Sequence, residues 1–280
     1  MIRIENLYKS FDGKAVLKNI STEFLKGQTN LIIGKSGSGK TVLLKSIVGL
    51  HEIDQGNIYY DDRNFTSMKA GDRKRLRQEI GMVFQGGALF DSLSVEENVR
   101  FPLDMFTNQS MAEKQKKIAF CLERVNIQQE AFRLSPSEIS GGMQKRVAIA
   151  RAIALNPPYL FCDEPNSGLD PETSTVIDNL IHQITIDLNI TTIINTHDMN
   201  SVMEIGDKIL FISDGEKEWE GTKTEILYTR NKKLQEFVFA NRQYRQIRNE
   251  KMENADEGGR PETGDGRPED KKREDDRGNG

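Results

Sequence analysis

The segment GKSGSGKT, residues 34 to 41, has residue types and a spacing that suit phosphate binding. Between the apolar run NLII and a helix-like segment, its glycines let successive N–H groups point at phosphate oxygens, with a helix N-terminus behind them. Lys40 would reach the outer phosphates and Thr41 would bind Mg2+, a pattern that a chance glycine-rich turn explains poorly. The residues predicted to hold a nucleotide here are Gly34, Ser36, Gly37, Ser38, Gly39, Lys40, Thr41 and Val42.

An acidic pair, Asp163 and Glu164, ends the apolar run YLFC. Ligands of α/β sheets bind at the carboxyl ends of strands, so the pair is well placed for chemistry. We expect Asp163 to hold Mg2+ through its water shell and Glu164 to orient and activate the attacking water, because phosphoryl transfer depends on positioning and charge neutralisation. Alone, the pair could equally be two solvated acids at a strand end, and the phosphate loop makes that interpretation the weaker one.

A Ser-Gly-Gly sequence precedes the long amphipathic run MQKRVAIARAIAL. In the plain interpretation, Ser140 caps the start of a helix. Gly141 and Gly142 would each cost that helix about 1 kcal/mol relative to alanine. We therefore expect their bare N–H groups to have a use, and a second phosphate is the candidate.

The elements that must position these residues alternate along the chain. Strand-like runs (LIIG, IGMVF, YLFCD, TTIINT, KILFIS) alternate with helix-like runs (TVLLKSIVGL, MAEKQKKIAFCLERV, GGMQKRVAIARAIAL, PETSTVIDNLIHQIT). This order predicts an α/β fold with a mostly parallel sheet. Period-2 patterns at the start predict an antiparallel β subdomain, with two strands joined at Lys26-Gly27. Residues from about 86 to 140 read as an inserted helical subdomain, and residues 223 to about 248 as a last helix.

Composition limits the class of protein. The 280 residues carry a net charge of −4, and residues 251–280 hold seven Lys/Arg and ten Asp/Glu, so the rest is nearly neutral and shows no nucleic-acid footprint. That tail lacks Val, Ile, Leu, Phe, Tyr and Trp, and we expect residues 241–280 to be a helix end followed by a disordered tail. No apolar run approaches the ~20 residues of a membrane span, and no signal peptide is recognised, so a cytosolic protein is expected. Cys121 and Cys162 are expected to be buried free thiols.

These motifs together resemble the ATP-binding-cassette (ABC) ATPases over about residues 1 to 240. The similarity comprises the Walker A loop GKSGSGKT, a Q-loop glutamine at Gln85, the signature ISGGM, Asp163 and Glu164 of Walker B, the D-loop SGLD from Ser167, and a switch histidine at His197. The resemblance implies a P-loop NTPase core that hydrolyses ATP with Mg2+. It also implies a head-to-tail homodimer, in which the signature of one chain completes the ATP site of the other.

The resemblance assigns further roles. Gln85 is expected to reach Mg2+ and the attacking water, and His197 the γ-phosphate. Phe11 aligns with the aromatic residue that stacks on adenine, with Val16 beside it, although Tyr8 competes for this role and either aromatic could be plain core. The signature departs from the commonest form at Ile139 and Met143, and neither change touches the Ser-Gly-Gly.

The segment FQGGALFDSLSVEENVRFPL indicates the partner. In the family, the loop after Gln85 faces an integral membrane permease, so Ala88, Leu89 and Phe90 are expected on the docking surface; the alternative is that GALF packs in the helical subdomain. The sequence of this segment, together with Met143 in the signature, resembles that of Mla/Mce-type phospholipid transporter ATPases. That resemblance implies lipid-transfer subunits as further partners and a peripheral location on the cytoplasmic face of the inner membrane. Two alternatives remain: an importer of a small polar solute such as an amino acid, and a soluble factor acting on ribosomes or DNA.

Overall fold

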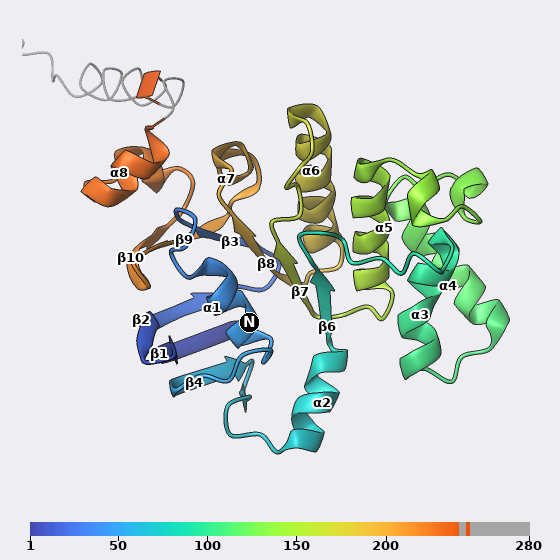
Figure 1. Cartoon of the computed structure of the whole chain (residues 1–280), viewed down its shortest axis with the longest axis horizontal. Coiled ribbons are helices and arrows are strands. Elements are labelled where there is room, and N and C mark those ends of the chain that lie inside the picture. The colour runs from blue at the N-terminus through green and yellow to red at the C-terminus, as the bar shows by residue number, and fades with distance from the viewer. Residues whose placement is uncertain (241–244, 247–280) are drawn as a thin grey trace, which may run out of the picture.

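The computed structural model of the chain describes residues 1–240, 245 and 246. At its centre lies a six-stranded sheet with the order β10-β9-β3-β8-β7-β6 (Figure 1). The five strands from β9 to β6 run parallel, and β10 pairs antiparallel with β9 at the edge. The strands are β3 (Thr29–Ile33), β6 (Ile80–Val83), β7 (Tyr159–Asp163), β8 (Thr191–Thr196), β9 (Lys208–Ser213) and β10 (Glu216–Gly221).

A second, antiparallel sheet of four strands has the order β2-β1-β4-β5. It contains β1 (Ile2–Phe11), β2 (Lys14–Phe24), β4 (Gln55–Tyr60) and β5 (Arg63–Asn64). The hairpin turn falls at Asp12 and Gly13, both of which have positive φ. The strands on either side of Lys26-Gly27 form as expected, but β2 belongs to this sheet and β3 to the parallel one. Lys26-Gly27 therefore joins the two strands as a crossing from the antiparallel sheet to the parallel one.

Helices cover both faces of the parallel sheet and extend beyond its β6 edge. α1 (Lys40–Ile47) lies between the two sheets, and Figure 1 shows α3, α4 and α5 gathered beyond β6. Ser94 and Ser110 begin α3 and α4 with capping boxes, each closed by a Glu three residues later. The other helices are α2 (Ala70–Gln78), α3 (Val95–Phe106), α4 (Met111–Arg124), α5 (Gly141–Ile153), α6 (Pro171–Asp187), α7 (Met199–Ile205) and α8 (Lys232–Val238).

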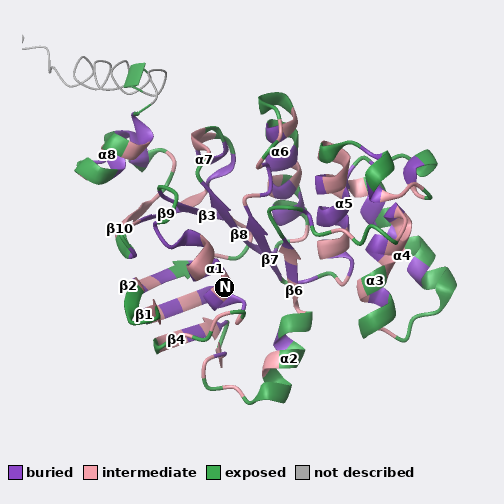
Figure 2. Ribbon diagram, in the orientation of Figure 1, coloured by how far each residue is buried: buried purple, intermediate pink, exposed green. Residues whose placement is uncertain are grey.

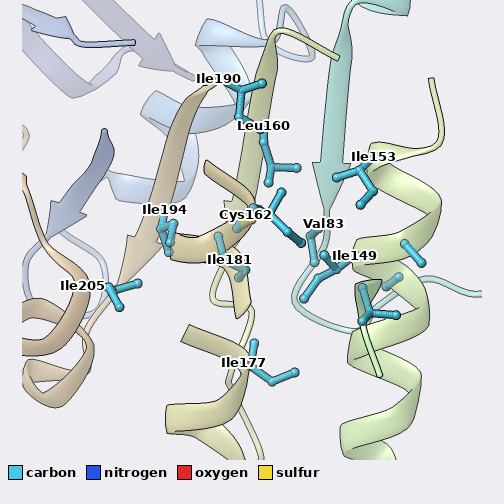
Figure 3. Close-up of a cluster of buried hydrophobic side chains, with 14 of the residues drawn as sticks. Val83, Ile149, Ile153, Leu160, Cys162, Ile177, Ile181, Ile190, Ile194 and Ile205 are labelled. Atoms are coloured by element: carbon cyan, nitrogen blue, oxygen red, sulfur yellow. The ribbon is translucent and has the colours of Figure 1, made fainter. Parts of the chain in front are cut away.

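Two hydrophobic cores lie on opposite faces of the parallel sheet. Successive residues of β7 alternate between them: Tyr159 and Phe161 pack toward α1 and the antiparallel sheet, while Leu160 and Cys162 pack toward α5 and α6. Figure 3 shows part of the second core, with Cys162 beside Ile181. Figure 2 shows the central strands buried along most of their length, which is why they read as continuous apolar runs.

The α/β class predicted from the sequence is confirmed, whereas the predicted helix from 223 to about 248 is wrong as one element. Its described part is a 3-10 turn, Glu225–Tyr228, followed by α8 from Lys232. Asn231 caps α8, since its side chain accepts from the N–H of Leu234. The rest of that segment and the charged tail 251–280 fall outside the described residues, apart from 245 and 246.

Two further expectations concern the thiols and the membrane. Cys121 and Cys162 are both buried and free, as expected. Burial raises the pKa of Cys121 to about 11 and that of Cys162 further still. Across the described part of the chain, none of the helices combines the length and the apolar character that crossing a bilayer requires.

Candidate active site

The glycine-rich loop leaves β3 at the carboxyl edge of the parallel sheet and leads directly into α1. Gly39 is the N-cap of α1 with φ 105°, a conformation that favours glycine, and a Cβ on Gly34 would lie 2.2 Å from the Ile212 carbonyl oxygen. Lys40 Nζ donates to Gly34 O at 2.8 Å and to Lys35 O at 3.2 Å. The loop therefore encloses a buried ammonium group at the start of a helix.

Two opposing effects act on the pKa of Lys40. Burial lowers the pKa of its ammonium, and the nearby Glu164 and Asp163 carboxylates raise it. The acidic pair that ends β7 is thus close enough to the glycine-rich loop to act on Lys40 electrostatically. The two sequence motifs that predicted phosphate chemistry converge at one edge of the sheet.

Thr41 and Asp163 are joined by a residue that the sequence analysis missed, Asn195 of β8. Asn195 Nδ2 donates to Asp163 Oδ1 at 2.6 Å and to Thr41 Oγ1 at 3.1 Å, and Thr41 Oγ1 lies 3.3 Å from Asp163 Oδ1. Asn195 and Asp163 are neighbours in the register of β7 and β8, so their side chains leave the same face of the sheet. The only signal in the sequence was a lone amide near the end of an otherwise β-branched run.

Glu164 lies at the centre of a second cluster, just beyond the end of β7. Its Oε1 is 3.0 Å from His197 Nδ1, and its Oε2 accepts from Gln85 Nε2 at 3.3 Å. Gln85 Nε2 also donates to Ser167 Oγ at 3.2 Å. Glu164 has φ 48°, which is uncommon for a residue with a side chain, and its N–H donates to Asn195 O. Three segments far apart in the sequence therefore meet at one carboxylate.

The loop that carries Gln85 is fixed from α5. Lys145 Nζ donates to the backbone carbonyl of Gln85, and Arg151 donates to the carbonyls of Gly87 and Ala88, both at 2.7 Å. Burial lowers the pKa of Lys145, while Glu164 raises it. Lys145 was not expected from the sequence, where it reads as an ordinary polar position of an amphipathic helix.

The residues of the predicted signature are not part of this cluster within one chain. Ser140 caps α5 as expected, accepting from the N–H of Met143 at 3.2 Å, and Ser140 and Gly141 are exposed. Figure 1 shows α5 separated from α1 by the strands β8, β7 and β6. The expected contact of Ser140, Gly141 and Gly142 with a phosphate therefore requires a second chain and remains a prediction.

The residues expected around adenine lie near the tip of the β1–β2 hairpin. Val16 is next to the glycine-rich loop, because a Cβ on Gly39 would lie 3.2 Å from its carbonyl oxygen. The ring of Phe11 is 39% exposed and contacts His51 edge-on, with centroids 5.2 Å apart. Tyr8 is half-buried. The stacking role of Phe11 remains a prediction, as does the contact of Gln85 with Mg2+.

The oxygen atoms at this edge suit Mg2+ bound together with a phosphate. In the described residues, no three His, Cys, Asp or Glu side chains form a cluster that could hold a metal ion. Mg2+ typically takes one or two protein oxygens and keeps waters and phosphate oxygens as its other ligands, so Thr41 and Asp163 suffice. Ser38 Oγ and Asn195 Oδ1 are among five buried side-chain atoms of the described residues that lack a protein partner, and Ser38 lies within the loop that would receive a phosphate.

Comparison with known proteins decides the family. Residues 17–167 match the family described as ABC transporter. The chain belongs to this family. The methionine import ATP-binding protein MetN of Clostridioides difficile (strain 630) is 39% identical over 238 residues, which cover 85% of this chain and 74% of that protein. The intermembrane phospholipid transport system ATP-binding protein MlaF of Haemophilus influenzae is 35% identical over 238 residues, covering 85% and 90%.

The fold agrees with this membership. A dimeric ATP-binding cassette, MJ0796, solved with ADP and Pi in a post-hydrolysis state, aligns with a TM-score of 0.73 and 32% identity over 80% of this chain and 99% of that one. The protein is therefore an ABC ATPase, and dimers with membrane permease partners are typical of its family.

Proposed function

We propose that this ABC ATPase powers a separate membrane permease and that the transported cargo is phospholipid. An apolar groove beside the Gln85 loop carries the proposal. It has a volume of about 500 Å3 and lies among α2, β6, α3 and α5. Its lining includes four exposed phenylalanines, Phe84, Phe90, Phe101 and Phe106. So many large exposed apolar side chains in one concave surface are typical of a protein interface.

The groove is connected to the catalytic cluster by short links. Phe90 and Arg151 line it, and Arg151 donates to the backbone carbonyls of Gly87 and Ala88, which are two and three residues beyond Gln85. Gln85 in turn donates to the Glu164 carboxylate. A permease segment seated in this groove would therefore respond to the position of the residues around the nucleotide. This is the coupling that a transport ATPase needs.

One residue expected on the docking surface is not there. Ala88 and Phe90 are exposed and line the groove, but Leu89 is half-buried and packs against the core that contains α5. Leu89 follows a turn at Ala88, whose φ is 48°, and its contacts with the core take it out of the groove. Phe90 is consequently the residue to alter.

The proposed roles at the site are supported by the geometry of the cluster and by the resemblance to the family. Lys40 and the N–H groups of the glycine-rich loop hold the phosphates, and Thr41 and Asp163 hold Mg2+, which neutralises charge on the phosphates when bound. Glu164 orients the attacking water and takes its proton, with His197 and Gln85 fixing its two oxygens. Ser140, Gly141 and Gly142 of a second chain complete the site in a homodimer. Residues 1–240 form the ATPase domain in this proposal, with residues 86–140 as its helical subdomain.

Two observations bear on the cargo, and they favour different candidates. The match to MlaF covers 90% of that phospholipid transport protein, and the segment after Gln85 together with Met143 resembles the same type. Amino-acid import is the second candidate, because the MetN relatives reach 39% and 40% identity. A phospholipid transporter would place the chain on the cytoplasmic face of the inner membrane, with lipid-transfer subunits as additional partners.

The test alters the groove without touching the site. Phe90→Glu places a hydrated carboxylate in the apolar groove, and covering it with a permease segment is unfavourable even with Arg151 beside it. Phe120→Glu is the matched control, since Phe120 is 45% exposed on α4 and lies outside the groove. We expect Phe90→Glu to bind ATP normally but to lose co-purification with the membrane protein, and Phe120→Glu to retain both.

The cargo is tested on the intact complex reconstituted in vesicles, with labelled phospholipid and labelled methionine offered in parallel. ATP-dependent phospholipid movement supports the proposal, and methionine movement without phospholipid movement favours the second candidate. If Phe90→Glu co-purifies as well as the wild type, the groove is not the docking surface.

A further inference from the structure

A buried carboxylate outside the catalytic cluster, that of Asp178 in α6, binds two segments of the site at once. Asp178 is 3% exposed. Asn166 Nδ2 donates to its two oxygens at 3.2 and 3.4 Å and to Ser201 Oγ at 2.9 Å. The Ser201 hydroxyl also lowers the pKa of the Asp178 carboxyl through a side-chain hydrogen bond. The three side chains therefore form a closed triangle with little access to water.

The corners of this triangle lie next to catalytic groups. Asn166 is in the loop between Glu164 and Ser167, which contact His197 and Gln85 respectively. Ser201 is in α7, the short helix that begins directly after the His197 segment. Asp178 belongs to a different element, the 17-residue helix α6. One carboxylate on a long helix thus holds both the loop after Glu164 and the helix after His197.

Packing alone does not require a carboxylate at this position. Its neighbours along the helix face, Ile177 and Ile181, are fully buried core residues. Burial raises the pKa of Asp178 to about 6, and the hydrogen bonds from Ser201 and Asn166 oppose that rise. Asp198, the N-cap of α7, and Glu204, within α7, raise the pKa of Asp178 further. The ionised carboxylate is therefore disfavoured both by desolvation and by repulsion from these two acids.

The other titratable group that faces Asp178 is Cys162 of β7. Its thiol pKa is raised mainly by burial and then by Asp178, so this thiol adds no charge to the pocket. A charge placed in such surroundings destabilises the fold unless its hydrogen bonds are used. The hydrogen bonds of Asp178 to the loop after Glu164 and to the helix after His197 are what this buried carboxylate provides.

We propose that Asp178 is a positioning residue for ATP hydrolysis, which locks the Glu164 loop and the His197 segment in one relative arrangement through Asn166 and Ser201. The proposal concerns the ATPase reaction itself and depends on neither the permease nor the cargo. Its loss should lower the rate of the chemical step, because Glu164 and His197 would no longer be held together. ATP binding at Lys40 should be unaffected.

Three variants test it in the full-length protein. Asp178→Leu removes the carboxylate and its hydrogen bonds, whereas Asp178→Asn keeps an acceptor oxygen but cannot ionise. Thr185→Val is the control, because Thr185 is another fully buried polar residue of α6, bonded to Ile181 O and Thr192 Oγ1 away from the site. We expect Asp178→Leu to lower kcat about tenfold with the KM for ATP unchanged, and Thr185→Val to lower Tm without that loss.

The pH profile separates positioning from a purely structural role. When Asp178 is protonated it gives up acceptor capacity, so the wild-type kcat should fall as the pH drops through about 6. Asp178→Asn resembles the protonated carboxyl, so its kcat should stay near the low-pH level of the wild type at every pH and show no step near pH 6. If Asp178→Leu keeps kcat within twofold of wild type, or if the step near pH 6 persists in Asp178→Asn, the proposal is wrong.

Discussion

Replacement of Asn195 by leucine tests whether the amide that joins Thr41 to Asp163 sets the affinity for Mg2+. The substitution keeps the branching of the side chain and removes two hydrogen bonds, of 2.6 Å to Asp163 Oδ1 and 3.1 Å to Thr41 Oγ1. A partner that orients metal ligands typically contributes 10- to 100-fold in metal affinity, or about 1.4 to 2.7 kcal/mol. We expect the Mg2+ concentration for half-maximal ATPase activity to rise by about that factor.

The assay follows ATPase rate against free Mg2+ at fixed ATP, with equilibrium binding of a fluorescent ATP analogue measured in Mg2+ and in EDTA. Binding in EDTA should match the wild type, because Lys40 and the glycine-rich loop are unchanged, while the gain on adding Mg2+ should shrink. Asn30→Leu is the matched control. Asn30 is also fully buried, but its amide bonds are to the backbone of Leu25, Gln28 and Thr192.

Asn30→Leu should therefore cost more stability than Asn195→Leu and leave the Mg2+ dependence unchanged. Asn30 loses four satisfied bonds, whereas the Oδ1 of Asn195 has no protein partner to lose. An unchanged Mg2+ requirement in a folded Asn195→Leu protein would refute the reasoning, because Asn195 would then be a structural residue only.

Further predictions concern the base, the shared site and the thiols. Glu164→Gln should bind ATP but hydrolyse it at least ~100-fold more slowly in a permease-coupled assay, and near-normal turnover would reject Glu164 as the base. Lys40→Ala chains mixed with Ser140→Arg chains should trap ATP in heterodimers with one intact site, as neither parent does; absence of trapping in verified heterodimers would contradict a site shared between chains. Cys121 and Cys162 should resist an alkylating reagent at pH 8 until the protein unfolds, as seen by mass spectrometry, since burial raises both thiol pKa values; rapid labelling of the folded protein would contradict their burial.

The sequence predicted best the elements that are buried on both faces. Strands such as β7 and β9 are covered on both faces, so nearly every residue is apolar and the run is visible without knowing its neighbours. The glycine-rich loop was equally visible, because its backbone geometry demands particular residue types. The prediction of one helix from 223 to about 248 was wrong because residues with helical composition continue through Thr229 to Asn231. The 3-10 turn ends there, and Asn231 caps the start of α8.

Other features depend on which elements become neighbours, and a single sequence does not contain that information. The two strands joined at Lys26-Gly27 read as parts of one antiparallel subdomain until β3 is seen to pair with β8 and β9. Leu89 reads as part of an apolar surface until the turn at Ala88 directs it into the core. Lys145 reads as a surface lysine until the Gln85 carbonyl is found within reach of its ammonium.

The buried amides of the central sheet suggest how such positioning residues can be recognised. Asn30 and Asn195 are both fully buried in central strands, but they lie at different ends of the sheet. Asn30 is near the amino end of β3, where it ties neighbouring backbone segments together. Asn195 is near the carboxyl end of β8, beside Asp163 in the register. Because parallel strands present their carboxyl ends to the ligand, a polar residue late in a buried strand indicates the site, and one early in the strand indicates the fold.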